Sequence, residues 1–348
     1  MIDAHVHLDR ALTAEDKFVE HERQSIRELM GLPLRLKQRA VGKFHSGLAY
    51  EPKSLLERME KVIRGKIKAG ETEVWACIDT TPREDIGLVA FEAAIDLAKR
   101  YADKIKIKVG AYPVFGLKSI GSDRHEIIRE AAKRAHFLVG LPERDVAPDH
   151  PIGFRGHIRA LLELGQEFSL PVHVHLDQAN NPSEAGTETL IEGVRWLGSP
   201  TVEGMAGPTV WAVHVISPSA YLDEDFKRLL DGLKETNIGV IVCPHAAISM
   251  RQLRPLFSPT HNSIARVREM LAAEIPVRIG TDNIGDIFVG LKRPDLEREI
   301  ELIQSAVRLY DEVLWHKVAR GEPLDDVDLH TVQISLEEDD EVFRTLPL

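Results

Sequence analysis

The chain has 348 residues, of which 43% are hydrophobic and 28% are charged, and its formal net charge is −11. A chain of this length and composition buries a core without disulfide support, and its acidic balance excludes nucleic acid as the main partner, because phosphate binding needs a basic surface. No apolar run is long enough to span a membrane, and the N-terminus lacks the regions of a signal peptide. We therefore expect a cytoplasmic protein with a small-molecule substrate and no membrane contact; the sequence is compatible with a homo-oligomer.

Short apolar runs alternate along the chain with amphipathic stretches of helical period. The expected strands are 2–7, 73–79, 106–112, 137–141, 172–176, 210–215, 239–243 and 277–281. The expected helices between them include 54–68, 86–101, 126–135, 156–168, 221–235 and 264–273. Eight strands alternating with helices predict an α/β fold, a parallel (β/α)8 barrel, as a single domain over residues 1–348. The alternative is an open doubly wound sheet, which the missing glycine-rich loop after the first strand disfavours.

Three segments lie outside this alternation. Residues 11–46 form an extended first loop, in which we expect one or two helices over the barrel mouth, either as a solvated charged surface or as a lid. Residues 296–317 are expected to form one long amphipathic helix that closes the barrel. Residues 325–348 form an acidic tail, with a strand expected at 331–335.

Histidines and one aspartate mark the ends of the predicted strands. His5 and His7 leave the same face of the first strand, because side chains alternate along a strand. His175, His214 and Asp282 lie at or just past the ends of later strands, where the active site of a barrel forms. Several imidazoles and one carboxylate suit Zn²⁺ or Fe²⁺, which activates water near neutral pH. Asp282 and His214 are the candidates for moving the proton of that water.

Five sequence segments occur in an order that is typical of a known family. They are IDAHVHLD at 2–9, VHLD at 174–177, VH at 213–214, IARVREML at 264–271 and GTD at 280–282. Through them the chain resembles the amidohydrolase superfamily, and within it the cytosine deaminase-like branch. The resemblance implies one divalent metal ion per subunit and implies that His214 orients the attacking water. The metal ligands that it implies are His5, His7, His175 and Asp282. The end of the fourth strand lacks the lysine of two-metal members, which supports a single ion.

Two positions depart from the pattern of this branch. The glutamate that protonates the substrate ring in the deaminases is replaced by Gln178, which cannot deliver a proton in that way. The glutamine that reads the pyrimidine edge is replaced by Val114. We therefore expect hydrolysis of a C–N bond, by deamination, in a small cyclic or aromatic nitrogenous compound other than cytosine. Ring opening of a lactam or cyclic amide is the alternative, and a metal-binding barrel without catalysis is the non-enzyme alternative.

Other polar residues follow predicted strand ends and are candidates for substrate binding beside Gln178. Arg10 and Arg254 either bind a substrate carboxylate through two parallel hydrogen bonds or form salt bridges between loops. His245 and Asn283 either face the substrate or stabilise their loops. The small β-sandwich that usually flanks the barrel in this family is expected to be absent, unless the native start lies upstream of Met1.

Overall fold

Eight parallel strands form one sheet in which each strand pairs with the next along the chain. The computed structural model describes residues 1–249 and 264–345. The strands are β1 (Ile2–His7), β2 (Glu73–Asp79), β3 (Lys106–Tyr112), β4 (Phe137–Gly140), β5 (Val172–Leu176), β6 (Val210–His214), β7 (Ile238–Val242) and β8 (Val277–Ile279). The predicted (β/α)8 barrel is confirmed.

Backbone hydrogen bonds between β1 and the residues after β8 close the barrel. The N–H of Asp282 donates to the carbonyl oxygen of His5 at 2.8 Å, and the N–H of His7 donates to the carbonyl oxygen of Asp282 at 2.8 Å. Gly280 permits this approach, because a Cβ there would lie 2.8 Å from both Cβ and the carbonyl oxygen of His5. The closure therefore holds three of the predicted metal ligands side by side.

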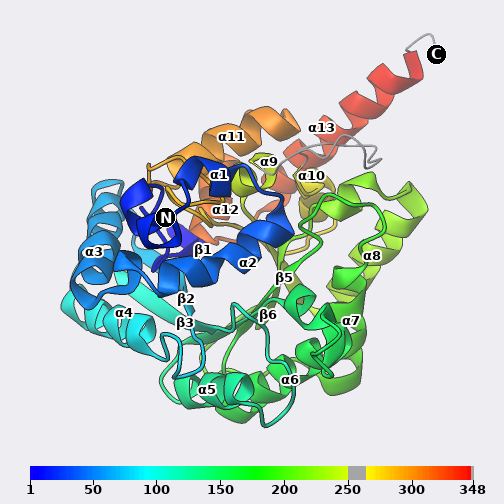
Figure 1. Ribbon diagram of the computed structural model, residues 1–348. Coiled ribbons are helices and arrows are strands. Elements are labelled where there is room, and N and C mark those ends of the chain that lie inside the picture. The colour runs from blue at the N-terminus through cyan, green and yellow to red at the C-terminus, as the bar shows by residue number, and fades with distance from the viewer. Residues whose placement is uncertain (250–263, 346–348) are drawn as a thin grey trace.

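Helices surround the barrel, and α3 illustrates why they form where they do (Figure 1). Its buried residues Leu55, Met59 and Val62 are spaced by four and three residues, so they share the face that packs toward the sheet. The helices are α1 (Ile26–Met30), α2 (Leu34–His45), α3 (Pro52–Lys68), α4 (Val89–Arg100), α5 (Asp123–Ala132), α6 (Gly153–Phe168), α7 (Gly186–Leu197), α8 (Asp223–Thr236), α9 (Pro244–Ile248), α10 (Val267–Ala272), α11 (Glu297–Val307), α12 (Glu312–Arg320) and α13 (Asp326–Thr345). Within the described ranges, no helix has the length and apolar character needed to cross a membrane.

The first loop, residues 11–46, contains α1, α2 and two short 3₁₀ helices, Asp16–Phe18 and Glu20–Glu22. Figure 1 shows α2 lying across the near end of the barrel. Further 3₁₀ helices are Leu48–Tyr50, Pro142–Val146 and Ser217–Ala220. The helical content expected for this loop is therefore confirmed, and α2 covers the end of the barrel at which the strands terminate.

Two predictions for the C-terminal region are wrong. The single helix expected over 296–317 is two helices, α11 and α12, because Arg308 adopts a left-handed conformation (φ 57°) and Asp311 starts the next helix by accepting a hydrogen bond from the N–H of Leu314 at 2.9 Å. The strand expected at 331–335 lies inside α13, where the carboxylate of Asp325 caps the first turn by accepting from the N–H groups of Val327 and Asp328. The remaining predicted boundaries differ from the observed ones by three residues or fewer.

Candidate metal centre and active site

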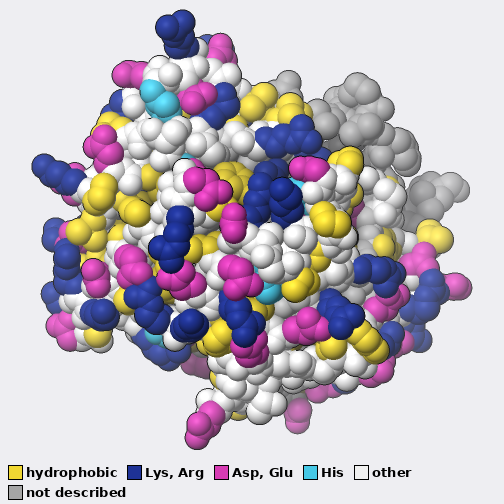
Figure 2. Space-filling view, turned by 60° about the horizontal axis from the view of Figure 1, so that its bottom comes forward, with side chains coloured by type: hydrophobic (Ala, Val, Ile, Leu, Met, Phe, Trp, Pro, Cys, Tyr) yellow, Lys and Arg dark blue, Asp and Glu magenta, His cyan; other side chains and the backbone are white. Residues whose placement is uncertain are grey.

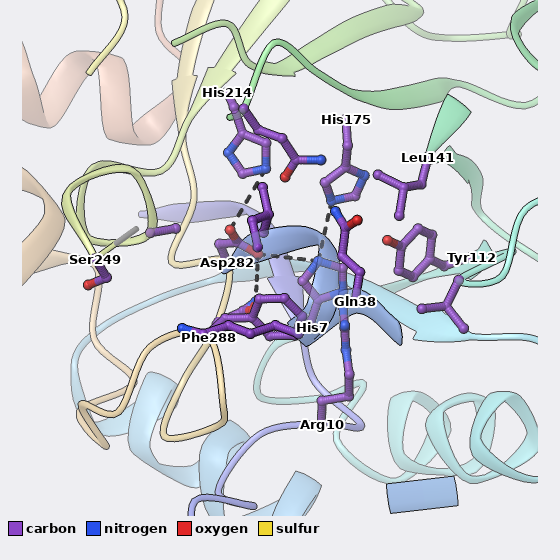
Figure 3. A pocket seen from close by; sticks show the side chains of 16 residues that line it. His7, Arg10, Gln38, Tyr112, Leu141, His175, His214, Ser249, Asp282 and Phe288 are labelled. Atoms are coloured by element: carbon purple, nitrogen blue, oxygen red, sulfur yellow. Dashed lines mark hydrogen bonds and ion pairs between the residues drawn. The ribbon is translucent and has the colours of Figure 1, made fainter. Parts of the chain in front are cut away.

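His5 and His7 of β1 and His175 of β5 converge at the carboxyl end of the barrel. Figure 3 shows His7 and His175 together with Asp282. The Nε2 atom of His175 lies 3.0 Å from Nε2 of His5 and 3.3 Å from Nε2 of His7. Nδ1 of His175 lies 2.9 Å from the carbonyl oxygen of Gly140, which can only accept, so Nδ1–H donates and Nε2 keeps its lone pair. Asp282 completes the group, with Oδ1 3.2 Å from Nε2 of His7 and 4.0 Å from Nε2 of His5.

The protonation states of these groups suit a cation. Burial lowers the pKa of His5, His7 and His175, so the three imidazoles are neutral near pH 7. Burial would raise the pKa of Asp282, but the hydrogen bond with His7 holds it well below its usual range. Three neutral nitrogen donors thus face one ionised carboxylate.

The spacing of the donors also fits a metal ion. In a tetrahedral site with metal–nitrogen bonds of about 2.0–2.1 Å, ligand atoms are about 3.3 Å apart. The nitrogen–nitrogen distances of 3.0 and 3.3 Å are close to that value. Lone pairs that face each other at this distance repel unless a proton or a cation lies between them. His5, His7, His175 and Asp282 therefore fit the site that the resemblance implies.

A second group of candidate ligands shares Asp282. His214, Cys243 and Asp282 each have a donor atom within 4.8 Å of the others, as do His5, His7 and His175. Nε2 of His214 lies 3.9 Å from Oδ2 of Asp282, whereas Oδ1 of the same carboxylate faces His7. Burial raises the pKa of the Cys243 thiol well above its usual value, so it remains protonated and is a poor ligand near pH 7. The carboxylate of Asp282 therefore lies between the two groups, with Oδ1 near His7 and Oδ2 near His214.

The backbone at the end of β6 is strained where it places His214. His214 has φ 82° and the β-branched Val215 has φ 50°, a region that such residues rarely adopt. Each such residue costs on the order of 1–3 kcal/mol, which the surrounding packing must offset. Nδ1 of His214 is buried without a hydrogen-bond partner among the described residues. Strain and an unsatisfied nitrogen at one position are typical of a functional residue.

A narrow cavity of about 60 Å³ opens onto these groups. Among the predicted substrate-binding residues, Arg10, Gln178 and Asn283 line it, as do His7, His175, His214 and Asp282. His245 is held instead by Glu299, with Nδ1 3.0 Å from Oε1, while its neighbours Ala246 and Ser249 line the cavity. Arg254 lies outside the described residues.

The structure adds residues that the sequence did not single out. Lys37 and Gln38 of α2 line the cavity together with Leu34, at a spacing of three and four residues that places all three on one helix face. Tyr112 and Phe288 form part of the wall. The helical period of residues 34–38 could have indicated from the sequence that Leu34, Lys37 and Gln38 share one face. No sequence pattern indicates Phe288.

Glu143 lies next to Gln178 but outside the cavity lining. Nε2 of Gln178 donates to Oε2 of Glu143 at 3.4 Å, and Oε1 of Glu143 is buried without a hydrogen-bond partner among the described residues. Burial, followed by the charge of Glu184, raises the pKa of Glu143 to about 8. One N–H of the Gln178 amide thus donates to Glu143, and the amide oxygen is available as an acceptor.

A buried histidine attaches α2 to the barrel. Nε2 of His45 lies 3.1 Å from Oδ2 of Asp79 at the end of β2, and Nδ1 lies 2.7 Å from Oδ2 of Asp85. Tyr50 also donates to Oδ2 of Asp79, at 3.0 Å. Burial alone would lower the pKa of His45, but its hydrogen bonds with Asp79 and Asp85 raise it to about 9. The charged imidazole therefore links the helix over the cavity to the strand ends beneath it.

Replacement of His45 by Gln is expected to destabilise the chain in a pH-dependent way. The folded pKa lies above the unfolded value of about 6.5, so the charge of His45 stabilises the fold fully below that value and loses this effect as pH rises through about 9. This difference between the folded and unfolded pKa of His45 corresponds to about 3 kcal/mol in the free energy of unfolding. Urea unfolding of the wild type and His45→Gln at several pH values should show a stability difference that narrows from pH 6 to pH 10. A difference that is constant with pH would contradict this role.

Comparisons with known proteins support the fold. No family model matches the chain. A protein of Haemophilus influenzae described as uncharacterized is 26% identical over 274 residues, which cover 78% of this chain and 90% of that protein. Among solved structures, 5-methylcytosine deaminase from Klebsiella pneumoniae matches with a TM-score of 0.76 and 22% identity over 96% of this chain and 74% of that one.

Two further solved structures are similar at lower identity. N-isopropylammelide isopropylaminohydrolase from Burkholderia multivorans matches with a TM-score of 0.62 and 18% identity over 95% of this chain and 70% of that one. Guanine deaminase from C. acetobutylicum matches with a TM-score of 0.54 and 15% identity over 95% and 70% of the two chains. At these identities the likeness establishes the barrel, and the fold implied by the sequence resemblance is thereby confirmed.

Proposed function

We propose that the chain is a member of the amidohydrolase superfamily, a metal-dependent hydrolase that deaminates a small cyclic or aromatic nitrogenous compound by cleaving a C–N bond. The observation that carries this proposal is the convergence of His5, His7, His175 and Asp282 beside His214 at the mouth of the barrel. The similar structures of two deaminases and an aminohydrolase add support.

His5, His7, His175 and Asp282 would hold a single Zn²⁺ or Fe²⁺ ion. When bound, such an ion supplies Lewis acidity, which makes water a nucleophile near neutral pH and polarises the carbon that is attacked. The remaining chemistry belongs to the side chains around it.

Asp282 and His214 are positioned to move protons. The Oδ2 atom of Asp282 faces His214 and can take a proton from the attacking water, and the neutral imidazole of His214 can accept a hydrogen bond from that water and pass a proton toward the leaving nitrogen. Asn283 donates from Nδ2 to Oδ1 of Asp282 at 2.9 Å and so fixes the orientation of the carboxylate. The helix α2 covers the cavity and limits the access of bulk water.

Ring opening of a lactam or cyclic amide is a second candidate, and the contact between Gln178 and Glu143 favours it. Because Glu143 accepts from the amide nitrogen of Gln178, the amide oxygen is left to accept from a substrate N–H. A cyclic amide presents such an N–H group, whereas cytosine presents an unprotonated ring nitrogen at the position that deaminases protonate.

Cytosine is expected to be a poor substrate of the wild type, and Gln178→Glu is expected to raise the rate of its deamination by about 10²-fold, the lower end of the range for a positioned acid. Steady-state assays on cytosine would measure this. The matched control is Gln38→Glu, which adds a carboxyl group to the same cavity at another position and should give no such gain. Efficient deamination of cytosine by the wild type, with no improvement in Gln178→Glu, would show that our interpretation of this position is wrong.

A substrate screen tests the function itself. Metal-loaded protein would be incubated with aminopyrimidines, triazines, lactams and cyclic ureas, with ammonia and product mass as readouts. Deamination releases ammonia, whereas ring opening adds one water and releases none. A protein that binds the metal ion but turns over no member of these classes would support a non-catalytic metal-binding barrel instead.

A further inference from the structure

Tyr112 is a buried side chain of the cavity wall that the proposed chemistry does not use. It is the last residue of β3, it lines the cavity, and it is 3% exposed. Its carbonyl oxygen accepts from the N–H groups of Thr80 and Val114, at 2.8 and 2.9 Å, which fixes the backbone at the strand end. The barrel itself therefore sets the position of Tyr112.

Packing against other rings fixes the side chain of Tyr112. Its ring centre lies 5.2 Å from that of His7 and 5.2 Å from that of His175, and it is stacked against His175 at an angle of 28°. The Cζ atom of Arg10 lies 5.6 Å from the same ring centre. Figure 3 shows Tyr112 beside His175 with its hydroxyl directed into the cavity. The ring thus rests against two proposed metal ligands, and the hydroxyl faces the space in which a substrate would lie.

The hydroxyl of Tyr112 has no hydrogen-bond partner among the described residues. By contrast, the hydroxyl groups of Tyr50, Tyr101 and Tyr221 each donate to an oxygen of the protein. A polar group that is withdrawn from water without a partner costs free energy, and native structures satisfy nearly all such groups. An unpaired hydroxyl in the wall of a cavity is therefore available to a ligand.

Tyr112 acts as a hydrogen-bond donor near neutral pH. A tyrosine hydroxyl is protonated there, and burial raises the pKa of Tyr112 further. Another donor of the wall, Nδ2 of Asn283, already donates to Asp282. Gln38 and Ser249 also lack a side-chain partner among the described residues, but Gln38 belongs to the covering helix and Ser249 is exposed. Tyr112 is thus an unpaired donor that the barrel holds in one place.

The charges around the cavity do not select an ionic ligand. The guanidinium of Arg10 lies 3.7 Å from Oδ1 of Asp79, and Asp9 and Asp286 add negative charge near it, so its charge is balanced within the protein. Figure 2 shows Lys and Arg side chains interspersed with Asp and Glu side chains over the face in view. Recognition by uncharged polar groups such as the hydroxyl of Tyr112 favours a neutral ligand with hydrogen-bond acceptors.

We propose that the hydroxyl of Tyr112 donates a hydrogen bond to a neutral acceptor on the substrate ring, an unprotonated nitrogen or a carbonyl oxygen, beside the carbon that faces the metal centre. This inference rests on the proposed function and names a specificity-determining residue for it. A ring without an acceptor at that position leaves the hydroxyl unpaired, so Tyr112 discriminates against such a ring.

Tyr112→Phe removes the hydroxyl and keeps the ring, and three neutral probes isolate the acceptor. 2-Aminopyrimidine carries unprotonated ring nitrogens, uracil carries carbonyl oxygens, and aniline has neither. Isothermal titration of the Zn²⁺-loaded wild type should show millimolar or tighter binding of at least one acceptor probe, weakened about 3–10-fold in Tyr112→Phe, the range for a neutral hydrogen bond. The affinity for aniline should be the same in both proteins. The control Tyr101→Phe, whose hydroxyl donates to Glu60 outside the cavity, should bind all three probes as the wild type does.

The outcomes separate this inference from the proposed function. Tyr112→Phe should keep the Tm and the Zn²⁺ affinity of the wild type, because its ring still packs against His7 and His175. The inference is overturned if the variant binds both acceptor probes as tightly as the wild type, if it loses Zn²⁺ or affinity for aniline to the same extent, or if neither acceptor probe binds the wild type in the millimolar range. Acceptor binding that depends on Tyr112 in a protein without hydrolytic activity would retain the inference and reject the function. Hydrolysis of a C–N bond together with unchanged probe binding in Tyr112→Phe would reject the inference alone.

Discussion

His214→Asn is expected to retain the metal ion and to lose about 10²–10⁴-fold in kcat, the range for a positioned acid–base group. Its Nε2 atom lies 3.9 Å from Oδ2 of Asp282, on the side of the carboxylate away from His7, so under the proposed function we expect it to move a proton rather than to bind the metal ion. Burial lowers its pKa, which keeps it neutral and able to accept a proton. Asparagine preserves a hydrogen-bonding group of similar reach but cannot titrate. Metal analysis and steady-state kinetics on the same preparation would measure both effects.

His136→Asn is the matched control for this variant. His136 directly precedes β4 and so lies at the opposite, amino-terminal end of the barrel. Its half-buried imidazole accepts a hydrogen bond from the N–H of Val109 and does not line the cavity, so His136→Asn should change kcat by less than about twofold. If His214→Asn loses the metal ion together with the rate, His214 is a fifth ligand. If His214→Asn keeps both the metal ion and the wild-type rate, the proposed role of His214 in proton transfer is wrong.

His175→Ala is expected to weaken metal binding by about 10²–10³-fold. Four ligands share a binding free energy of about 10–16 kcal/mol in zinc sites, so one ligand corresponds to roughly a quarter of it. The variant also leaves Nε2 of His5 and of His7 without the neighbour that lies 3.0 and 3.3 Å away. Activity should disappear at metal concentrations that saturate the wild type.

Thermal unfolding gives a second readout for the same variant that does not depend on activity. A ligand at 100 times its Kd stabilises the folded chain by about 2.7 kcal/mol. Addition of Zn²⁺ to chelator-treated wild type should therefore raise Tm by several degrees, and His175→Ala should show little rise at the same concentration. His150→Ala, which removes a histidine held by Asp145 outside the cavity, should respond as the wild type does. A wild-type response in His175→Ala would exclude it from the ligand set.

The sequence predicted the parts of the fold that depend on local periodicity. The strand ends at His7 and Leu176 match the predicted ends and the end at His214 differs by one residue, and the barrel brings the polar residues at and after these ends to one edge. The strand predicted at 331–335 is helical instead, because the cap at Asp325 starts a helix that continues through these residues. Local pattern alone does not decide between strand and helix in so short a run.

The position of α2 over the cavity could not be predicted from the sequence. Lys37 and Gln38 reach the cavity because α2 lies across the barrel, and that orientation depends on the contacts of His45 with Asp79 and Asp85. These partners are distant in sequence, so no motif joins them. The pairing of Gln178 with Glu143 is likewise a contact between the ends of neighbouring strands that spacing does not reveal.

The metal content of active protein tests the central claim most directly. Elemental analysis of the purified chain, measured with hydrolysis of a C–N substrate in the same preparation, should give about one Zn²⁺ or Fe²⁺ ion per chain, with activity that falls on chelation and returns in proportion to the ion added back. Two ions per chain in active protein would contradict a mononuclear centre at His5, His7, His175 and Asp282. Full hydrolytic activity in protein without any bound metal ion would contradict the account as a whole.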